Sequence, residues 1–309
     1  MLTVASYMKV IPPGNSNPEK PALLQNFITG VNASGDRGII CQTYHPMDTD
    51  VAVIQGFVHA NSKNAPHLKL RREVYENQRR RKKRCVIVDS NLFLAYDPKN
   101  TNTYLRYSYD GIFANSGEYC YSPETADPAR WAVLSKKLNI QIKPWKLQDT
   151  GHILIACQRD GGWSMQGQNV LQWLEQTVKR IRDVVDAPIL VRFHPGDKHK
   201  DTYGPKIKHL NVIPSTSASL LHDLKNARAF VGHNSSPAVI AAIEGVPVFL
   251  TDAGRSQAKD IAHHNFKDML DPKEFDRSIW LQKLAMCHWT QEELKNGSCW
   301  RHMKKWAVV

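Results

Sequence analysis

The segments APILVRFHPGDKH (residues 187–199) and ARAFVGHNSSPAVIAAIEGVPVFL (residues 227–250) decide the fold of this chain. Within them, residues 188–193, 227–232 and 246–250 are short apolar runs rich in β-branched and aromatic side chains. Runs of this length and composition are typical of strands that are buried on both faces of a parallel sheet. A helix fits between the last two runs, so the pattern predicts an α/β fold.

Polar residues follow the first two predicted strands at their carboxyl ends. His194 and Pro195 follow the first strand, and Ser235 and Ser236 follow the second, just before Pro237. A serine suits the N-cap and a proline suits the first helical turn, so a helix is predicted to begin there. Ligands of open α/β sheets bind outside the strand ends, and a helix N-terminus favours an anion. The pattern favours a phosphate site, with a simple turn and a simple helix cap as the alternative interpretation.

These two motifs resemble the HP and SS motifs of GT-B glycosyltransferases, such as bacterial sialyltransferases and the Kdo transferases of capsule synthesis. The resemblance covers most of residues 151–255. It implies an α/β fold of the GT-B type, in which two Rossmann-like domains with parallel sheets face a central cleft. It also implies that His194 and the serine pair hold the phosphate of a nucleotide-sugar donor, activated by UDP or CMP. No further cofactor is expected.

A donor site is therefore predicted in the second half of the chain. The strand predicted at 153–157 is followed by an arginine and two glycines. Glycine lets the backbone approach a phosphate and arginine offers it two donors, so this loop suits a phosphate. Glu244 is a candidate contact for the donor ribose, or else a surface acid. The predicted donor-binding residues are Arg159, Asp160, Gly161, Gly162, Arg192, His194, Pro195, His233, Asn234, Ser235, Ser236 and Glu244.

The first half of the chain also alternates between predicted strands and helices. The strand CVIV at 85–88 ends at Asp89, which the resemblance places at the catalytic carboxylate of these transferases. The next two residues are serine and asparagine, where that family has an acid and a glycine. We expect Asp89 to be the general base for the acceptor hydroxyl, with Asp110 and Asp160 as alternatives. An aspartate after a strand also often only caps a turn.

The length of 309 residues suits two domains. We expect an acceptor-side Rossmann-like domain at 1–145 and a nucleotide-sugar-binding domain at 151–309. Two helices are predicted at 278–306, and in GT-B proteins such helices often cross back to the first domain. A turn-rich loop at 12–18 is either a ligand-admitting loop or an ordinary connection.

Composition bears on location and on metal content. The sequence has no apolar run near 18 residues and no secretory pattern at its start, so we expect a cytoplasmic protein without membrane insertion, in the host cell if phage-encoded. The six cysteines show no CxxC spacing, and the adjacent His263 and His264 would point apart, so neither a zinc site nor a disulfide framework is expected. The groups predicted to hold the donor phosphate are hydrogen-bond donors of the protein itself. We therefore expect transfer that does not need a metal ion.

The net charge of +12 indicates a polyanionic partner. We expect DNA, with 5-hydroxymethylpyrimidines of phage DNA as the acceptor, because phosphate neutralisation by lysine and arginine dominates DNA binding. One alternative is a capsule or lipopolysaccharide glycosyltransferase at the inner membrane face, where basic residues meet anionic lipid. Another is a non-catalytic basic nucleic-acid-binding protein. The predicted DNA-binding run, which could also be a solvated helix end, is Arg79, Arg80, Arg81, Lys82, Lys83 and Arg84.

Overall fold

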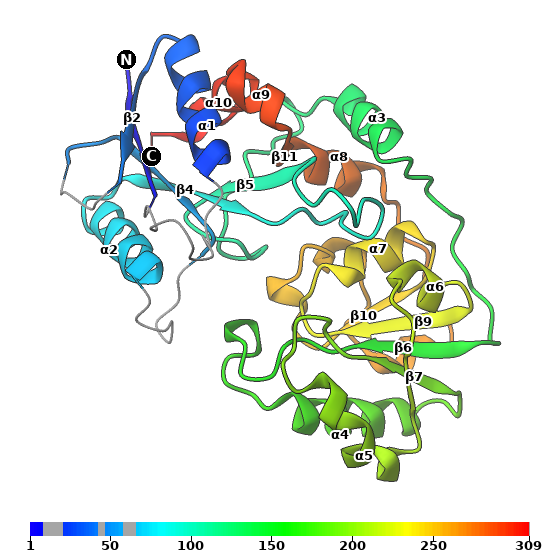
Figure 1. The fold of residues 1–309 in the computed structure, drawn as a ribbon. Helices are drawn as coiled ribbons and strands as arrows, with labels where there is room; N and C mark the ends of the chain where they lie inside the picture. Colours follow the sequence, from blue (N-terminus) through cyan, green and yellow to red (C-terminus); the bar gives the residue numbers. More distant parts are fainter. Residues whose placement is uncertain (9–20, 43–46, 58–65, 309) are drawn as a thin grey trace.

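The computed structural model describes residues 1–8, 21–42, 47–57 and 66–308. The described part contains two β-sheets, each with helices packed on it (Figure 1). The loop predicted at 12–18 lies outside the described residues. None of the described helices is long and apolar enough to cross a membrane.

The first sheet has six strands, and helices of the first half cover it. Its elements are β1 (Thr3–Tyr7), α1 (Pro21–Ala33), β2 (Arg37–Cys41), β3 (Val51–Gln55), α2 (Pro66–Arg80), β4 (Arg84–Asp89), β5 (Leu105–Tyr109) and β11 (His288–Trp289). The strand order is β11-β5-β4-β3-β1-β2, with β1 to β4 parallel. β5 and β11 join antiparallel at one edge. Residues 51–54 are fully buried, as expected for a central strand with both faces covered.

The second sheet has five strands and is entirely parallel. Its elements are β6 (His152–Ala156), α4 (Val170–Arg182), β7 (Ile189–Arg192), α5 (Tyr203–Lys206), β8 (Ile213–Pro214), α6 (Leu220–Leu224), β9 (Ala227–Gly232), α7 (Pro237–Ile243) and β10 (Val248–Leu250). The order is β10-β9-β6-β7-β8. The three strands predicted from the quoted segments are confirmed as β7, β9 and β10. Their carboxyl ends meet at one edge because all the strands are parallel.

The end of the chain packs against the first sheet. Instead of the two helices predicted at 278–306, the structure has α8 (Ser278–Met286), β11, α9 (Gln291–Lys295) and α10 (Ser298–Met303). The prediction was wrong there because His288 and Trp289 pair with β5 and interrupt the helical run. Trp300 is fully buried, meets the Phe27 ring edge-on at 6.0 Å, and donates its indole N–H to Asp36 at 2.8 Å. These contacts fix the last helices on α1.

An apolar cluster also joins the two halves of the molecule. α3 (Pro128–Lys137) packs on α8, and both lie beside the loop that follows β4 (Figure 1). Leu92 and Phe93 from that loop share one buried cluster with Trp280 of α8 and with residues 238–243 of α7. The two halves therefore contact each other through apolar side chains as well as through the polar residues described next.

Candidate functional site

A cavity of about 510 Å³ lies between the two sheets. The last residue of β4, Asp89, and β5 residue Arg106 belong to its lining. The loops after β4 and β5 contribute Ser90, Leu92, Ile112 and Phe113. The loops after β6, β7, β9 and β10 contribute Gln158, Arg159, Gly162, Ser164, His194, Asn234, Ser235, Ser236, Arg255 and Gln257. The cavity is thus formed at the carboxyl edges of both sheets, where α/β proteins commonly bind ligands.

Contacts between the domains close one side of this cavity. The Gln257 side chain donates to the Tyr119 hydroxyl at 2.7 Å and to the Ile112 carbonyl at 3.2 Å. The Arg255 guanidinium lies over the Phe113 ring, 5.0 Å from its centre. Residues 112–119 of the first domain therefore lie against residues 255–257 of the second. A ligand bound in the cavity would contact both domains.

The charged groups that line the cavity favour an anion. Arg106, Arg159 and Arg255 contribute three guanidinium groups, whereas Asp89 is the one acid among the described lining residues. Three buried polar groups of the lining also lack a hydrogen-bond partner in the described part of the chain, namely Arg106 Nε, Gln158 Oε1 and the Ser235 hydroxyl. Buried polar groups are normally paired, so an unpaired donor beside a cavity indicates a place for a ligand acceptor.

His194 is held in a defined orientation and tautomer. Its Nδ1 accepts from the Gly196 backbone N–H at 2.9 Å and from Arg159 Nε at 3.3 Å. Since Nδ1 is an acceptor, the proton of the neutral ring is on Nε2. Burial, and then the Arg159 cation, hold the pKa of His194 below its ordinary value. A neutral ring that donates from Nε2 suits a phosphate oxygen.

Gly196 was missed by the sequence reasoning, although it follows the His-Pro motif directly. A Cβ at this position would lie 2.5 Å from Arg159 Nη2, closer than side-chain atoms approach. Glycine therefore lets the guanidinium of Arg159 lie against the loop after β7. The arginine and the histidine are held together as one donor group on the wall of the cavity.

The serine pair lies at the start of α7, but it does not cap the helix with its side chains. Ser236 is the N-cap residue, and its hydroxyl makes no capping hydrogen bond. The Ser235 hydroxyl is buried without a partner in the described part of the chain. Asn234 is tied to Gln158, to Asp252 and to the Ser164 carbonyl. The two serine hydroxyls therefore remain available to a ligand, which the alternative interpretation as a simple cap does not explain.

Asp89 lies at the carboxyl end of β4 and faces the cavity. Its Oδ2 forms an ion pair with Arg106 Nη2, and the strand register places Arg106 directly opposite Asp89 on β5. Arg106 is only 6% exposed. The sequence reasoning missed this arginine because the antiparallel pairing of β5 gives no local sequence signal. The ion pair with Arg106 holds the Asp89 carboxylate in place through Oδ2. Asp89 Oδ1 has no hydrogen bond within the described part of the chain.

Neither alternative base lies on the cavity. Asp110 accepts from the Cys85 backbone N–H and pairs with Arg84, both at the amino end of β4. Asp160 accepts from the Val170 backbone N–H at 2.9 Å and so fixes the start of α4. Both carboxylates have structural partners. Asp89 is the remaining candidate base.

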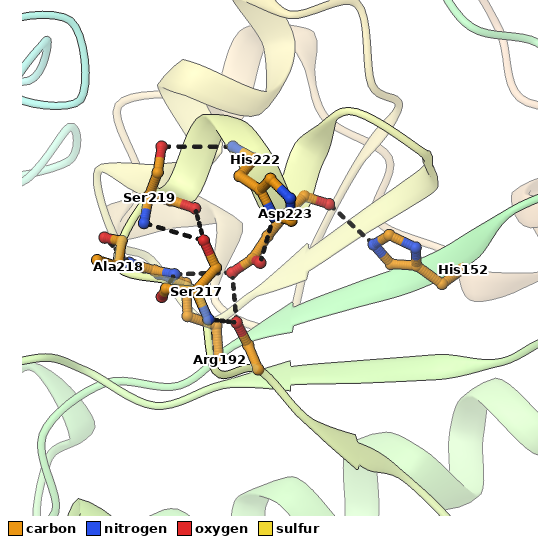
Figure 2. Close-up of polar contacts among 8 residues, drawn as sticks. His152, Arg192, Ser217, Ala218, Ser219, His222 and Asp223 are labelled. Carbon is orange, nitrogen blue, oxygen red and sulfur yellow. Dashed lines mark hydrogen bonds and ion pairs between the residues drawn. The ribbon is translucent and has the colours of Figure 1, made fainter.

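Two predicted donor contacts are corrected by the structure. Arg192 is not among the residues that line the cavity. Its guanidinium donates to Asp223 at 2.7 Å and to the carbonyls of Ser217 and Ala218 (Figure 2). It holds the loop after β8 instead of a ligand. Glu244 is buried and accepts from the Tyr96 hydroxyl and from Lys143. It ties the end of α7 to Tyr96 and Lys143 of the first domain and does not line the cavity, so it is not placed to contact a ribose.

The remaining predicted donor residues lie around the cavity without lining it. His233 is buried, and its Nδ1 lies 2.7 Å from the Thr251 hydroxyl. Gly161 has a φ of +60°, which the turn before the lining residue Gly162 requires. Pro195 is exposed in the loop after His194. These three residues shape the loops rather than the cavity surface.

The basic run lies at the far end of β4 from Asp89. Three of its six members are paired with acids: Arg81 with Asp48, Lys83 with Asp50 at 2.8 Å, and Arg84 with Asp110 at 2.6 Å. Arg79, Arg80 and Lys82 are exposed. The paired half of the run neutralises local acids, so only part of the predicted DNA-binding charge faces solvent.

The sequence contains one Asp-x-Asp triplet, Asp48-Thr49-Asp50, which bears on the expectation that transfer does not need a metal ion. This triplet precedes β3, at the edge of the sheet opposite to the cavity, and both carboxylates pair with the basic run. Among the residues that the structure describes, no group of three or more histidine, cysteine or acidic side chains could hold a metal ion. Metal-independent transfer is a prediction that the chelator experiment in the Discussion addresses.

No protein-family model matches this chain, and no curated protein matches it. Two solved structures from Thermosulfurimonas dismutans KpsC match over nearly the whole length. The β-Kdo 2,7-transferase has a TM-score of 0.54 at 12% identity, over 92% of this chain and 89% of that one. The β-Kdo 2,4-transferase has a TM-score of 0.55 at 12% identity, over 91% and 89%. The predicted fold class, GT-B with two Rossmann-like domains facing a cleft, is thereby confirmed.

Proposed function

We propose that this protein is a glycosyltransferase that moves a sugar from a nucleotide-sugar donor to a hydroxyl group of an acceptor. One observation carries the proposal. In a single cavity, the carboxylate of Asp89 from one domain faces His194, Arg159 and the free serine hydroxyls of the other. This reaction requires a general base on one side and, on the other side, a set of hydrogen-bond donors that hold the donor phosphate.

The chemistry follows from this arrangement. The acceptor oxygen attacks the anomeric carbon, and its proton passes to the Asp89 carboxylate. The bond between the anomeric carbon and the donor phosphate oxygen breaks, and the phosphate leaves with the electron pair. His194 Nε2–H, Arg159 and the Ser235 hydroxyl stabilise the charge that develops on that phosphate. No side chain has to move a second proton, because a nucleotide phosphate is a stable anion at neutral pH.

For the acceptor, an envelope glycan agrees better with the charge distribution than DNA does. Half of the basic run is paired with acids, and the run lies at the amino end of β4, whereas Asp89 lies at its carboxyl end. At about 3.3 Å per residue, this strand separates the two by roughly 15–20 Å. Capsule or lipopolysaccharide synthesis at the inner membrane face therefore becomes the leading proposal, and anionic lipid is a partner for the exposed basic residues.

Hydroxymethylated DNA is the second candidate acceptor, and the exposed Arg79, Arg80 and Lys82 favour it. Together with the net charge of +12 they could neutralise a few backbone phosphates. The non-catalytic nucleic-acid-binding protein is the third possibility. Binding of nucleic acid would explain the basic surface. It would not explain why His194 is held in a defined orientation opposite Asp89 in the cavity.

Donor hydrolysis in the absence of an acceptor tests the proposed function. The protein is incubated with a panel of UDP- and CMP-sugars, and nucleotide release is followed by mass spectrometry. We expect release from one nucleotide class, and a loss of about 10²–10³-fold in His194→Ala, the typical effect of removing one preorganised donor. His264→Ala, an exposed histidine outside the cavity, is the matched control. Release from no nucleotide sugar, or equal rates in both variants, would contradict the proposal.

A further inference from the structure

Gln158 is a buried residue of the cavity wall that was not among the predicted donor-binding residues. It lies in the loop after β6, is 6% exposed and lines the cavity. Its Nε2 donates to Asn234 Oδ1 at 2.6 Å, whereas its Oε1 is buried and has no hydrogen-bond partner in the described part of the chain. A buried amide oxygen without a partner costs free energy, so its place beside a cavity indicates a ligand group that donates to it.

The partners of Asn234 fix which end of the Gln158 amide is left unpaired. Asn234 Nδ2 lies 2.8 Å from the Asp252 carboxylate and 3.2 Å from the Ser164 carbonyl. A carboxylate and a carbonyl only accept hydrogen bonds, so Asn234 directs its NH2 group at them and its Oδ1 at Gln158. Since Oδ1 also only accepts, Gln158 has to donate through Nε2. The amide oxygen of Gln158 is therefore the end that remains for a ligand.

Arg255 is held by the same two acceptors. Its guanidinium donates to Asp252 Oδ2 at 2.5 Å and to the Ser164 carbonyl at 3.2 Å. Asp252 and Ser164 thus connect the loops after β6, β9 and β10 through one network of hydrogen bonds. A network of this kind holds each member in one orientation, so the acceptor on Gln158 is in place before a ligand binds.

We propose that Gln158 determines the specificity for the nucleotide sugar, and that its Oε1 accepts a hydrogen bond from a hydroxyl group next to the donor phosphate. The inference rests on the proposed function and specifies its substrate. Gln158 and Asn234 directly precede Arg159 and Ser235, which are proposed to hold that phosphate. An ionised phosphate oxygen has no proton to donate, so the phosphate itself is not the partner of Oε1. The nearest hydroxyl groups of a nucleotide sugar belong to the ribose on one side and to the transferred sugar on the other.

A neutral acceptor suits a position beside a phosphate. A carboxylate there would repel the anion, whereas an amide oxygen accepts a hydrogen bond without a net charge. Glu244, the acid that was expected to contact the ribose, is bound to Tyr96 and Lys143 instead. A nucleotide sugar without the hydroxyl would leave Oε1 buried and unpaired, so the site should reject it.

The test compares the nucleotide sugar with analogues that lack one hydroxyl group. Wild-type protein is given the nucleotide sugar identified by hydrolysis, and analogues in which a single hydroxyl of the ribose or of the sugar is replaced by hydrogen. The measured quantity is kcat/KM for the parent compound divided by kcat/KM for the analogue. This ratio does not depend on the fraction of folded protein. For one analogue, we expect it to be about 10–100-fold larger in the wild type than in Gln158→Met, because the buried acceptor is lost.

The variants connect the preference to the amide oxygen. Gln158→Met is unbranched and fills a similar space without an acceptor of comparable strength. Gln158→Asn keeps an amide but is one methylene shorter, so it should lose the preference as well. Each analogue has the same intrinsic reactivity with every variant, so a difference between variants comes from the protein. Gln176→Met, an exposed glutamine of α4 that does not line the cavity, should keep all the wild-type ratios.

The outcomes separate the proposed function from the role of Gln158. If no nucleotide sugar is hydrolysed, the proposed function fails. If one is hydrolysed but every ratio is the same in the wild type and in both Gln158 variants, the specificity inference is overturned while the proposed function stands. A response of a ribose analogue identifies the nucleotide as the source of the hydroxyl, and a response of a sugar analogue identifies the transferred sugar.

Discussion

Acidification should destabilise the first domain through His288, which is fully buried at the edge of the first sheet. Its Nδ1 donates to the Leu284 carbonyl at 2.7 Å, and its Nε2 accepts from the Leu92 backbone N–H at 3.2 Å. Both bonds require the neutral ring, because a protonated ring would direct a second N–H at the N–H of Leu92. Burial lowers the pKa of His288 from 6.5 to about 3.

The sign and size of the effect follow from linkage. The pKa is lowered in the folded state, so below pH 6.5 the unfolded state binds a proton that the folded state does not. Stability is lost as the pH falls from about 6.5 toward 3, at about 1.4 kcal/mol per pH unit. At pH 5.0 the free energy of unfolding should therefore be about 2 kcal/mol lower than at pH 7.5 from this histidine alone. His302, with a pKa lowered by burial to about 4, contributes in the same direction.

Urea unfolding at pH 7.5 and pH 5.0, followed by tryptophan fluorescence, measures this difference. His288→Gln should unfold more easily at pH 7.5, and its loss of stability between the two pH values should be about 2 kcal/mol smaller than in the wild type. His264→Gln, an exposed histidine, controls for the removal of a histidine as such. The reasoning is refuted if His288→Gln loses as much stability as the wild type. In the native protein, an NMR titration of the His288 ring with a midpoint near pH 6.5 would refute it independently.

Three further predictions concern the site and the basic run. Asp89→Asn should lower kcat about 10²–10⁴-fold, the usual contribution of a general base, with little change in the KM of the donor; an unchanged kcat would exclude Asp89 as the base. Transfer should persist in excess chelator, because Asp89 is the single acid among the described residues that line the cavity. Loss of activity in chelator that manganese or magnesium restores would contradict this. Replacing Arg79, Arg80 and Lys82 together with glutamine should leave transfer to a glycan unchanged, because these residues lie at the edge opposite to Asp89. If DNA is the acceptor instead, modification should fall, and the slope of log binding constant against log salt should flatten by about 0.9 per lost phosphate contact.

The strand ends of the second domain could be predicted from the sequence because they depend on local rules. An apolar run that stops at a histidine or at a serine pair indicates where a buried strand ends. The carboxyl ends of parallel strands share one edge, so residues far apart in the chain are expected to lie together. Arg159, His194 and Ser235 do line one cavity, although they come from three different loops.

The direction of a side chain at a strand end is not a local property. Arg192, the last residue of β7, was predicted to bind the donor, but it pairs with Asp223, which comes 31 residues later, and it does not line the cavity. Glu244 follows the same pattern, since its partner Tyr96 lies 148 residues earlier, in the other domain. A buried carboxylate or guanidinium is paired with an opposite charge or with a hydrogen-bond partner, and the sequence does not show which residue that partner is.

Partners that are distant in the sequence also explain why the basic run led to a prediction of DNA as the acceptor. Six consecutive basic residues are conspicuous in a sequence, whereas the acids that pair with three of them are scattered over residues 48–110. Arg106, by contrast, is a single arginine between Leu105 and Tyr107, and it lies buried beside Asp89. Folding therefore pairs half of the basic run with acids and places a less conspicuous arginine, Arg106, in an ion pair with Asp89 at the candidate site. A buried cation interacts more strongly with its neighbours than a solvated one, so Arg106 acts on Asp89 more strongly than the exposed residues of the basic run do.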